Sequence, residues 1–427
     1  MKFKLYATQT FEGVFEIEAD SFDEAQDILI DQINDGEVEL GGGDIMISSE
    51  DEKENDKKET STLVLGTTEI SYRAFKNRDD LSEVVIPDGV TKIGKEAFFG
   101  CKNLVSVTIP GSVKSIDGGA FRNCVNLASV TIDNGVENIG DFAFKNCRSL
   151  ISVTLPNSVT SIGKEAFIDC CCLTAITMGN NVANIDKSAF KDCTNLTSIV
   201  LPNGLKCIGN FAFYNCKVLA SIEIPDSVKT IGRDAFFSTA YHDNLANWKD
   251  EVLYIGNHLI EAKKSINGNY KVKVGTMSIA NYAFYDCENL TSITLPNSIT
   301  NLNDGVFYGC KELTSITLSN NLTSIGNYTF NFCFNLEAIT IPDNVISIGD
   351  RAFEGCLNLA LITFSKKLKS IGNYAFENCH KLTSISLPDS LTSIGSYVFY
   401  DCKNLVPVAL PSSVTKVGKA IFKDCKL

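Results

Sequence analysis

A 23-residue repeat runs through most of the 427-residue chain. Its most regular mark is a phenylalanine that recurs every 23 residues from Phe75 to Phe236 and, after a gap of 48 residues, from Phe284 to Phe422. A unit of this length cannot bury its own apolar face, whereas stacked units share one core. The repeat therefore predicts a solenoid. Its anchor phenylalanines are Phe75, Phe98, Phe121, Phe144, Phe167, Phe190, Phe213 and Phe236, then Phe284, Phe307, Phe330, Phe353, Phe376, Phe399 and Phe422.

Each unit has the pattern of one strand followed by turns. The unit at 290–312 reads LTSITLPNSITNLNDGVFYGCKE, in which Leu290, Ile293 and Leu295 are expected to point inward. The alternation of Ile293 and Leu295 with polar residues is typical of a half-buried strand. Pro296 cannot donate a hydrogen bond to a continuing strand and ends it. The I-G pair of most units predicts a second short extended segment, and the A-F pair predicts a short helical turn that buries the anchor ring.

Thirteen of the 16 cysteines follow an anchor phenylalanine by three residues. One interpretation is a disulfide or metal framework. Equivalent positions of stacked units have parallel side chains, however, whereas a disulfide needs two that converge. Paired C-x-x-C clusters are absent, and there are only three histidines. We therefore expect a ladder of buried, reduced thiols, which fits a reducing compartment. Cys171, Cys172 and Cys207 are the thiols expected to be exposed.

The full consensus is L-x-x-I-x-[LI]-P-x-x-[VL]-x-x-I-G-x-x-A-F-x-x-C-x-N, and it recurs in register between about residues 61 and 427, apart from one interruption. This pattern resembles the BspA-like, or type 5, leucine-rich repeats of bacterial and protozoan proteins. The resemblance implies a leucine-rich-repeat solenoid of parallel strands. It also implies a role in adhesion and protein binding, often at cell surfaces.

Five segments follow from the repeat, its interruption and the charge. Residues 1–60 contain 18 acidic residues and five lysines, so they account for the whole net charge of −13. We expect a small α+β domain at 1–48, an acidic flexible linker at 49–60, a first repeat array at 61–236, a hairpin insertion at 237–271 and a second array at 272–427.

The segment before the linker has its own pattern. It predicts strands at Lys2–Thr8 and Val14–Ala19, a helix that includes Ala25 to Ile33, and short strands at Glu37–Leu40 and Asp44–Ile47. This segment resembles the small DpnD/PcfM-type domain of bacterial mobile elements. That family implies no agreed activity.

The insertion predicts a β-hairpin around Gly256-Asn257, with strands at Glu251–Ile255 and His258–Ile260. It contains the only tryptophan, Trp248. Insertions in repeat proteins often bind partners, so Trp248 is a candidate binding residue. The alternative is that the insertion covers the seam between the two arrays, with Trp248 as its plug.

No motif for catalysis, cofactor binding or metal binding is present. The chain lacks G-x-x-x-x-G-K-[ST], G-x-S-x-G and H-E-x-x-H, and His242, His258 and His380 are scattered. We therefore expect no enzyme and no cofactor. The remaining enzymatic hypothesis places His242 or His258 beside a carboxylate in the insertion.

Charge and hydropathy limit the partners and the compartment. The acidic net charge argues against a nucleic-acid partner. No stretch approaches the ~20 apolar residues of a membrane span, and no signal peptide is readable at the start. We expect a cytoplasmic protein, with the cell surface by a non-classical route as the alternative. We also expect a monomer, with end-to-end association through the C-terminal repeat as a further option.

Aromatic residues flank the anchors two positions before and one position after. Tyrosine is favoured at interfaces because it joins an apolar ring to a polar tip. These residues predict a non-enzymatic scaffold that binds a protein partner of unknown identity, and a cell-surface adhesin is the alternative function. The other interpretation is that the rings only shield the seams between units. The candidate partner-binding residues are Tyr282, Tyr285, Tyr308, Tyr328, Tyr374, Tyr397 and Tyr400, together with Trp248.

Overall fold

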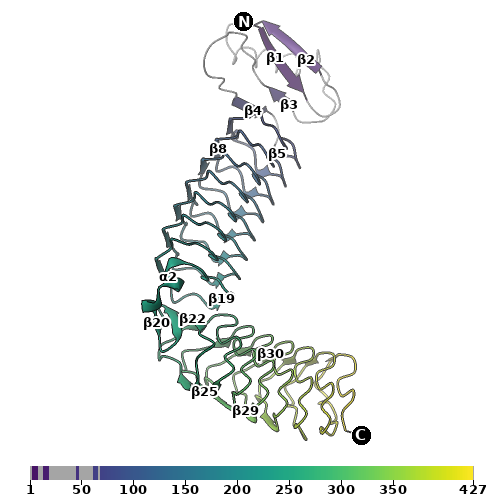
Figure 1. Cartoon of the computed structure of the whole chain (residues 1–427). Helices are drawn as coiled ribbons and strands as arrows, with labels where there is room; N and C mark the ends of the chain where they lie inside the picture. The colour runs from purple at the N-terminus through teal and green to yellow at the C-terminus, as the bar shows by residue number, and fades with distance from the viewer. Residues whose placement is uncertain (1, 8–12, 19–44, 48–60, 66–67, 427) are drawn as a thin grey trace. The chain divides into compact units, whose positions relative to one another are not determined.

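A computed structural model describes residues 2–7, 13–18, 45–47, 61–65 and 68–426. The repeats form successive coils that stack on one another (Figure 1). The described chain divides into two compact units. The first comprises residues 1–205, 211–222 and 236–240, and the second comprises 206–210, 223–235 and 241–427. The predicted leucine-rich-repeat solenoid of parallel strands is confirmed.

The first unit contains two columns of parallel strands. Strands one unit apart pair in register, so that Val130 lies between Val107 and Val153. Its longer strands are β4 (Ser61–Leu65), β6 (Glu83–Val85), β8 (Ser106–Ile109), β10 (Ser129–Ile132), β12 (Ser152–Thr154), β14 (Ala175–Thr177) and β16 (Ser198–Val200), followed by β18 (Ser221–Glu223). The two-residue strands are β5 (Glu69–Ile70), β7 (Lys92–Ile93), β9 (Ser115–Ile116), β11 (Asn138–Ile139), β13 (Ser161–Ile162) and β15 (Asn184–Ile185).

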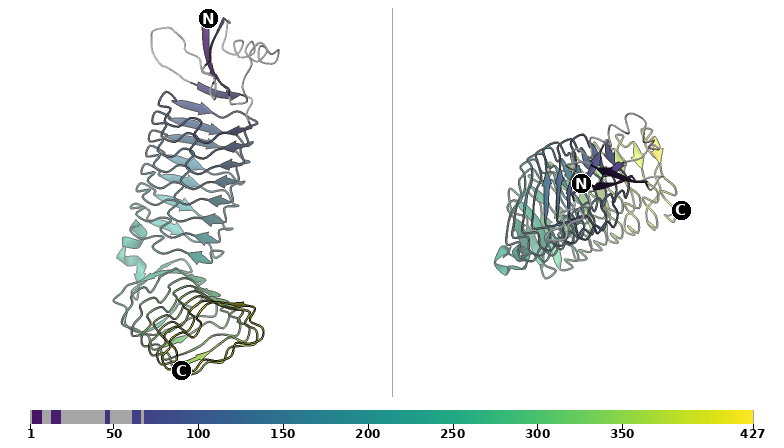
Figure 2. Two further views of the ribbon diagram at one scale, coloured as in Figure 1. Left: turned by 90° about the vertical axis from the view of Figure 1, so that its right-hand side faces the viewer. Right: turned by 90° about the horizontal axis from the view of Figure 1, so that it is seen from above.

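The second unit repeats this arrangement, and Figure 2 shows its coils from two further sides. Its longer strands are β23 (Gly268–Lys271), β25 (Leu290–Thr294), β27 (Ser315–Thr317), β29 (Ala338–Thr340) and β31 (Leu361–Thr363). Its two-residue strands are β17 (Cys207–Ile208), β19 (Thr230–Ile231), β24 (Ser278–Ile279), β26 (Asn301–Leu302), β28 (Ser324–Ile325), β30 (Ser347–Ile348), β32 (Ser370–Ile371), β33 (Ser393–Ile394) and β34 (Lys416–Val417). Because β23 pairs in parallel with β25, the strand ladder includes the last residues of the predicted insertion.

The segment around each anchor phenylalanine consists of consecutive turns, not of the short helical turn that we expected. Its backbone N–H groups donate alternately to the next coil and within the same coil. Phe98, for example, donates to the carbonyl of Ala120 at 2.7 Å, and Phe99 donates to that of Glu96 at 3.0 Å. Residues two before and two after every anchor have positive φ, which a right-handed helix cannot contain.

The anchor rings form the centre of the core. Phe98 and Phe121 are almost parallel, with ring centroids 5.0 Å apart, and such stacks follow one another along each array. Both rings are fully buried. The prediction that each unit contributes a phenyl ring to one continuous interior is therefore confirmed within each array.

The cysteine ladder has a hydrogen-bonding role that the sequence did not reveal. All 16 cysteines are free thiols, and the ladder thiols point at the preceding coil. The Cys193 Sγ lies 3.2 Å from the carbonyl oxygen of Phe167, and the Cys216 Sγ lies 3.2 Å from that of Phe190. The weakly donating S–H thus adds a second hydrogen bond to a buried carbonyl that already accepts a backbone N–H within its own coil, as the carbonyl of Phe167 does from Cys170. Burial raises the pKa of the Cys193 thiol well above its ordinary value, so the donor proton is retained.

The N-terminal strands are partly as predicted. β1 (Lys2–Ala7) pairs antiparallel with β2 (Gly13–Glu18), and β3 (Ile45–Ile47) pairs antiparallel with both β1 and β4. The predicted helix at Ala25 to Ile33, the strand at Glu37–Leu40 and the linker at 49–60 lie outside the described residues.

The insertion contains the predicted hairpin. β21 (Val252–Ile255) and β22 (His258–Ala262) pair antiparallel around Gly256-Asn257, and β20 (Trp248–Lys249) adds to β21. The helix α2 (Ala240–Asp243) and the 3-10 turn at Leu245–Asn247 precede them. No helix in the described part of the chain is long and apolar enough to cross a membrane.

The hairpin buries an ionisable residue. The imidazole of His258 has no exposed surface, and its Nδ1 lies 2.8 Å from the Oγ of Ser278 on β24. Burial lowers the pKa of His258 below its ordinary value, although Asp226 opposes this effect and Lys229 supports it.

We expect the free energy of unfolding to fall as the pH is lowered. The unfolded chain binds a proton on His258 near pH 6.5, whereas the folded imidazole resists it, so its contribution is complete above that pH and is lost below it. Urea unfolding at pH 7.5, 6.5 and 5.5 measures this loss, which the His258→Gln variant should reduce. His242 titrates in both proteins and cancels in the comparison. Equal pH slopes for the two proteins would contradict the prediction.

Candidate partner-binding site

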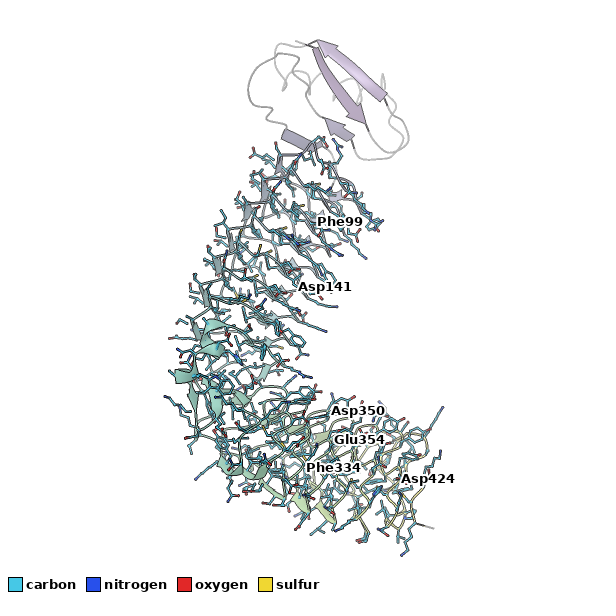
Figure 3. All side chains as sticks on the ribbon, viewed as in Figure 1. Phe99, Asp141, Phe334, Asp350, Glu354 and Asp424 are labelled. Atoms are coloured by element: carbon cyan, nitrogen blue, oxygen red, sulfur yellow. The ribbon has the colours of Figure 1, made fainter. Side chains whose placement is uncertain are left out.

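Every coil presents two side chains that flank its anchor, one from two residues before and one from the residue after. In the second array half of them are tyrosines, which we call the aromatic strip. Its members are Tyr282, Tyr285, Tyr308, Tyr328, Tyr374, Tyr397 and Tyr400, and each is half-buried. Glu354, the residue after the anchor Phe353, occupies the same column and is labelled in Figure 3.

The rings of the strip contact one another along the array. Tyr285 and Tyr308, one coil apart, stack with centroids 5.3 Å apart, and Tyr374 and Tyr397 stack at 5.1 Å. Within one coil, Tyr397 meets Tyr400 edge to face at 5.9 Å. The two flanking positions therefore share one surface even though the turn between them is not helical.

The backbone beneath the strip is unusual for such large side chains. Tyr374 has φ 56 and Tyr397 has φ 55, in the left-handed region that favours glycine. A residue with a Cβ loses about 1–2 kcal/mol there. The aromatic residues with this backbone are Phe142, Phe211, Tyr282, Tyr328, Phe332, Tyr374 and Tyr397.

The position two after each anchor has the same left-handed backbone and serves as an internal comparison. It is occupied by Asn, Asp or Gly in every coil except those with Ser238 and Phe332, as backbone preference dictates. The position two before the anchor follows that preference only at Gly119, Asp234 and Gly305. Backbone preference therefore explains the residues two positions after the anchors, but it does not explain the tyrosines two positions before them.

Glycines make room for the rings of neighbouring coils. A Cβ at Gly305 would overlap the ring of Tyr282, and a Cβ at Gly355 would overlap the ring of Phe332. Phe332 meets Tyr308 edge to face at 5.6 Å and extends the strip. Sequence reasoning missed Phe332 because it lies two residues after its anchor.

The middle of the strip is charged. Arg351 donates to Glu354 Oε2 at 2.9 Å and lies 3.5 Å from Glu377 Oε2. Its guanidinium also lies 4.4 Å above the ring of Tyr374. Asn331 Nδ2 donates to Glu354 Oε2 at 2.8 Å. We call Asn331, Arg351, Glu354 and Glu377 the carboxylate cluster. The sequence indicates this cluster at the position one residue after the anchors, where Asn331, Glu354 and Glu377 replace tyrosine in three successive coils.

A shallow polar groove of about 550 Å³ lies beside the strip in the second array. Its lining includes Ser347, Ser370, Gly349 and Gly372, so small residues repeat from coil to coil. A Cβ at Gly349 or Gly372 would overlap the backbone of the preceding coil, which explains the glycines by stacking alone. The Asp350 carboxylate accepts the backbone N–H of Asn373 at 2.6 Å and ties the groove wall together.

The first array has Tyr214 as its one tyrosine at these positions, and cations occupy several of the others. Arg122 lies 5.6 Å from the ring of Phe99 and 6.0 Å from that of Phe142. Lys76 lies 5.2 Å from Phe99, and Lys145 lies 5.3 Å from Phe142. Phe99 is labelled on this array in Figure 3. Phe99 and Phe142 thus have cationic partners within their own array.

Trp248 lies in the insertion, apart from the tyrosines in sequence, and its side chain contacts other residues of the insertion. Its Nε1–H donates to the carbonyl of His242 at 2.7 Å, and the Lys263 ammonium lies 5.1 Å from its ring. Burial opposes protonation of His242, but hydrogen bonds to Glu261 at 3.2 Å and Asp243 at 2.7 Å outweigh it and raise the pKa of His242. Both ring nitrogens are therefore held by carboxylates, which leaves neither to accept a proton from a substrate.

In the part of the chain that the structure describes, no three His, Cys, Asp or Glu residues are grouped to hold a metal ion. What the strip offers is an aromatic surface with a charged centre, which suits recognition of another macromolecule.

Comparison with known proteins agrees with the fold. A family model described as BspA type leucine-rich repeat region (6 copies) matches residues 68–197, 184–271, 262–383 and 323–427. No curated protein matches the chain.

Three solved structures are similar. A leucine-rich repeat protein from Bacteroides ovatus is 26% identical with a TM-score of 0.41, and the match covers 87% of this chain and 90% of that one. A leucine-rich cell surface protein from Faecalibacterium prausnitzii is 28% identical with a TM-score of 0.36, over 81% and 93%. A leucine-rich repeat protein from Eubacterium ventriosum is 25% identical with a TM-score of 0.41, over 86% and 91%.

We expect Tyr374→Gly to be more stable than Tyr374→Ala by about 1 kcal/mol, because only alanine keeps a Cβ in the left-handed region. Both variants lose the ring, so ring packing cancels in the comparison. Denaturant unfolding measures the difference. In the strand β27 the order should reverse, with Thr317→Ala more stable than Thr317→Gly. The same order at both sites would contradict the backbone analysis.

Proposed function

The chain belongs to the BspA-type leucine-rich repeat proteins, and we propose that it is a non-enzymatic scaffold that binds a protein partner through the aromatic strip of its second array. The proposal assigns partner contact to the seven tyrosines of the strip. Trp248 is a second, separate candidate contact on the insertion.

One observation carries this proposal. The tyrosines two residues before the anchors occupy a backbone conformation that opposes them, whereas the equivalent conformation two residues after the anchors is filled by Asn, Asp and Gly in all coils but those of Ser238 and Phe332. Strained positions of this kind are concentrated at functional sites, where the side chain is needed in spite of its cost. Ring-to-ring packing alone is a weaker reason, because aromatic pairs contribute only about 0.5–1.5 kcal/mol beyond their buried area.

The chemistry of the strip fits binding better than catalysis. Tyrosine and arginine are the residues that most often dominate the binding energy of protein interfaces, and both occur here. A non-enzymatic role and a monomeric chain are part of the proposal, and end-to-end association through the last coil is the alternative to a monomer.

Location inside the cell is also a proposal, and an adhesin at the cell surface is its alternative. Cys172 is an exposed thiol, so its labelling can distinguish the two locations. A membrane-impermeant thiol reagent should leave Cys172 unlabelled in intact cells and label it after lysis. Labelling in intact cells would favour the adhesin.

We expect the double variant Tyr308→Ser, Tyr400→Ser to lose capture of the partner by at least ten-fold, because each ring is a half-buried contact residue. The measurement is quantitative pull-down with the full-length chain as bait. The matched control is Thr317→Ser, Thr363→Ser, which alters the outward face of the strands β27 and β31. Unchanged capture by the tyrosine variant, with its fold verified by circular dichroism, would overturn the proposal.

A further inference from the structure

The carboxylate cluster contains two carboxylates for one cation. Glu354 and Glu377 lie on adjacent coils and share the guanidinium of Arg351, at 2.9 and 3.5 Å. Burial, and then the charge of Glu354, raise the pKa of Glu377 above its ordinary value. The pair thus lacks one positive charge.

Two buried acceptors in this cluster also lack a donor. Among the described residues nothing donates a hydrogen bond to Asn331 Oδ1, and Glu377 Oε2 has only the ion pair with Arg351 at 3.5 Å. Asn331 is only 1% exposed, and its carboxamide lies in the cluster because its Nδ2 donates to Glu354. An unpaired buried acceptor costs about 1–3 kcal/mol, and native structures rarely leave one unexplained.

The neighbouring carboxylate of Asp401 has two basic groups of the same chain beside it, unlike Glu377. Asp401 lies 3.2 Å from His380 Nε2 and 3.6 Å from Lys403 Nζ, so two basic groups of the chain itself face it. Glu377 has no second partner of this kind. The side chains of Glu354 and Glu377 reach the surface, with 12% and 15% of their area exposed, although Glu377 Oε2 itself is covered.

The surroundings favour an organic cation. Tyr308 precedes the cluster in the column after the anchors and Tyr400 follows it, and aromatic rings attract ammonium and guanidinium groups. A metal ion would need more acidic ligands than converge here, and it would meet the Arg351 guanidinium.

We propose that the partner of the aromatic strip places a lysine or arginine side chain at the carboxylate cluster, where it completes the charge of Glu354 and Glu377 and, once their side chains turn toward it, supplies the donor that Asn331 and Glu377 lack. This inference rests on the proposed function and names the chemistry of the partner, a polypeptide with an exposed basic residue. The basic residue is the central contact, and the tyrosines form the rim around it.

The test uses the full-length chain and a fluorescein-labelled hexa-arginine peptide as the probe, with binding followed by fluorescence anisotropy. Glu377→Gln should weaken binding about ten-fold or more, because a hydrogen bond to a charged group is lost. The matched control is Glu337→Gln, which removes the same charge from an exposed site of the second array. Equal weakening by both variants, or none by Glu377→Gln, would overturn the inference. Competition by spermidine as strong as that by unlabelled peptide would overturn the assignment to a polypeptide.

A stability measurement separates binding from a structural role. In the free protein, Glu377→Gln removes the repulsion from Glu354, so its melting temperature should rise while its binding falls. A melting temperature that falls would indicate a structural role and overturn the inference. Loss of partner capture by the tyrosine variants, together with unchanged peptide binding by Glu377→Gln, would leave the proposed function standing and remove only this inference.

Discussion

The structure depends on the register with which one coil stacks on the next. Parallel strand pairs one unit apart, such as Ser129 with Ser106, fix that register on the outer columns. At the anchors, the N–H of one phenylalanine reaches the next coil, and a cysteine S–H from the next coil returns to its carbonyl. Because coils are tied in this way, equivalent side chains 23 residues apart form columns along each array.

Much of this arrangement was predictable from the sequence. The spacing of Phe98 and Phe121, and of the cysteines that follow them, predicts both the stack of rings and the absence of disulfides, because repetition in a solenoid makes equivalent side chains parallel. The hairpin around Gly256-Asn257 was also predictable, because its turn residues tolerate positive φ. These features follow from patterns within one or two units.

The features that sequence reasoning missed depend on the conformation of the turns. The A-F pair of each unit does not indicate that the residue two positions before the phenylalanine has a left-handed backbone. Tyr374 and Glu165, which occupy that position, disfavour this conformation. The thiol donors and the carboxylate cluster were missed for a related reason. They join residues whose proximity appears only once coils are placed on one another, as with Asn331 and Glu354.

Because the surface is built from columns, its residues come from different repeat units. Asn331, Glu354 and Glu377 adjoin in space, yet each belongs to a different unit of the chain. No short linear peptide taken from this protein reproduces the patch, and an antibody raised against such a peptide would meet only one of its parts. Conversely, duplication or deletion of a whole unit leaves the strand pairing and ring stacking of the other units in place while it lengthens or shortens the patch by one row. The extent of the recognition surface can therefore change with the number of repeat units, without any change in the composition of the core.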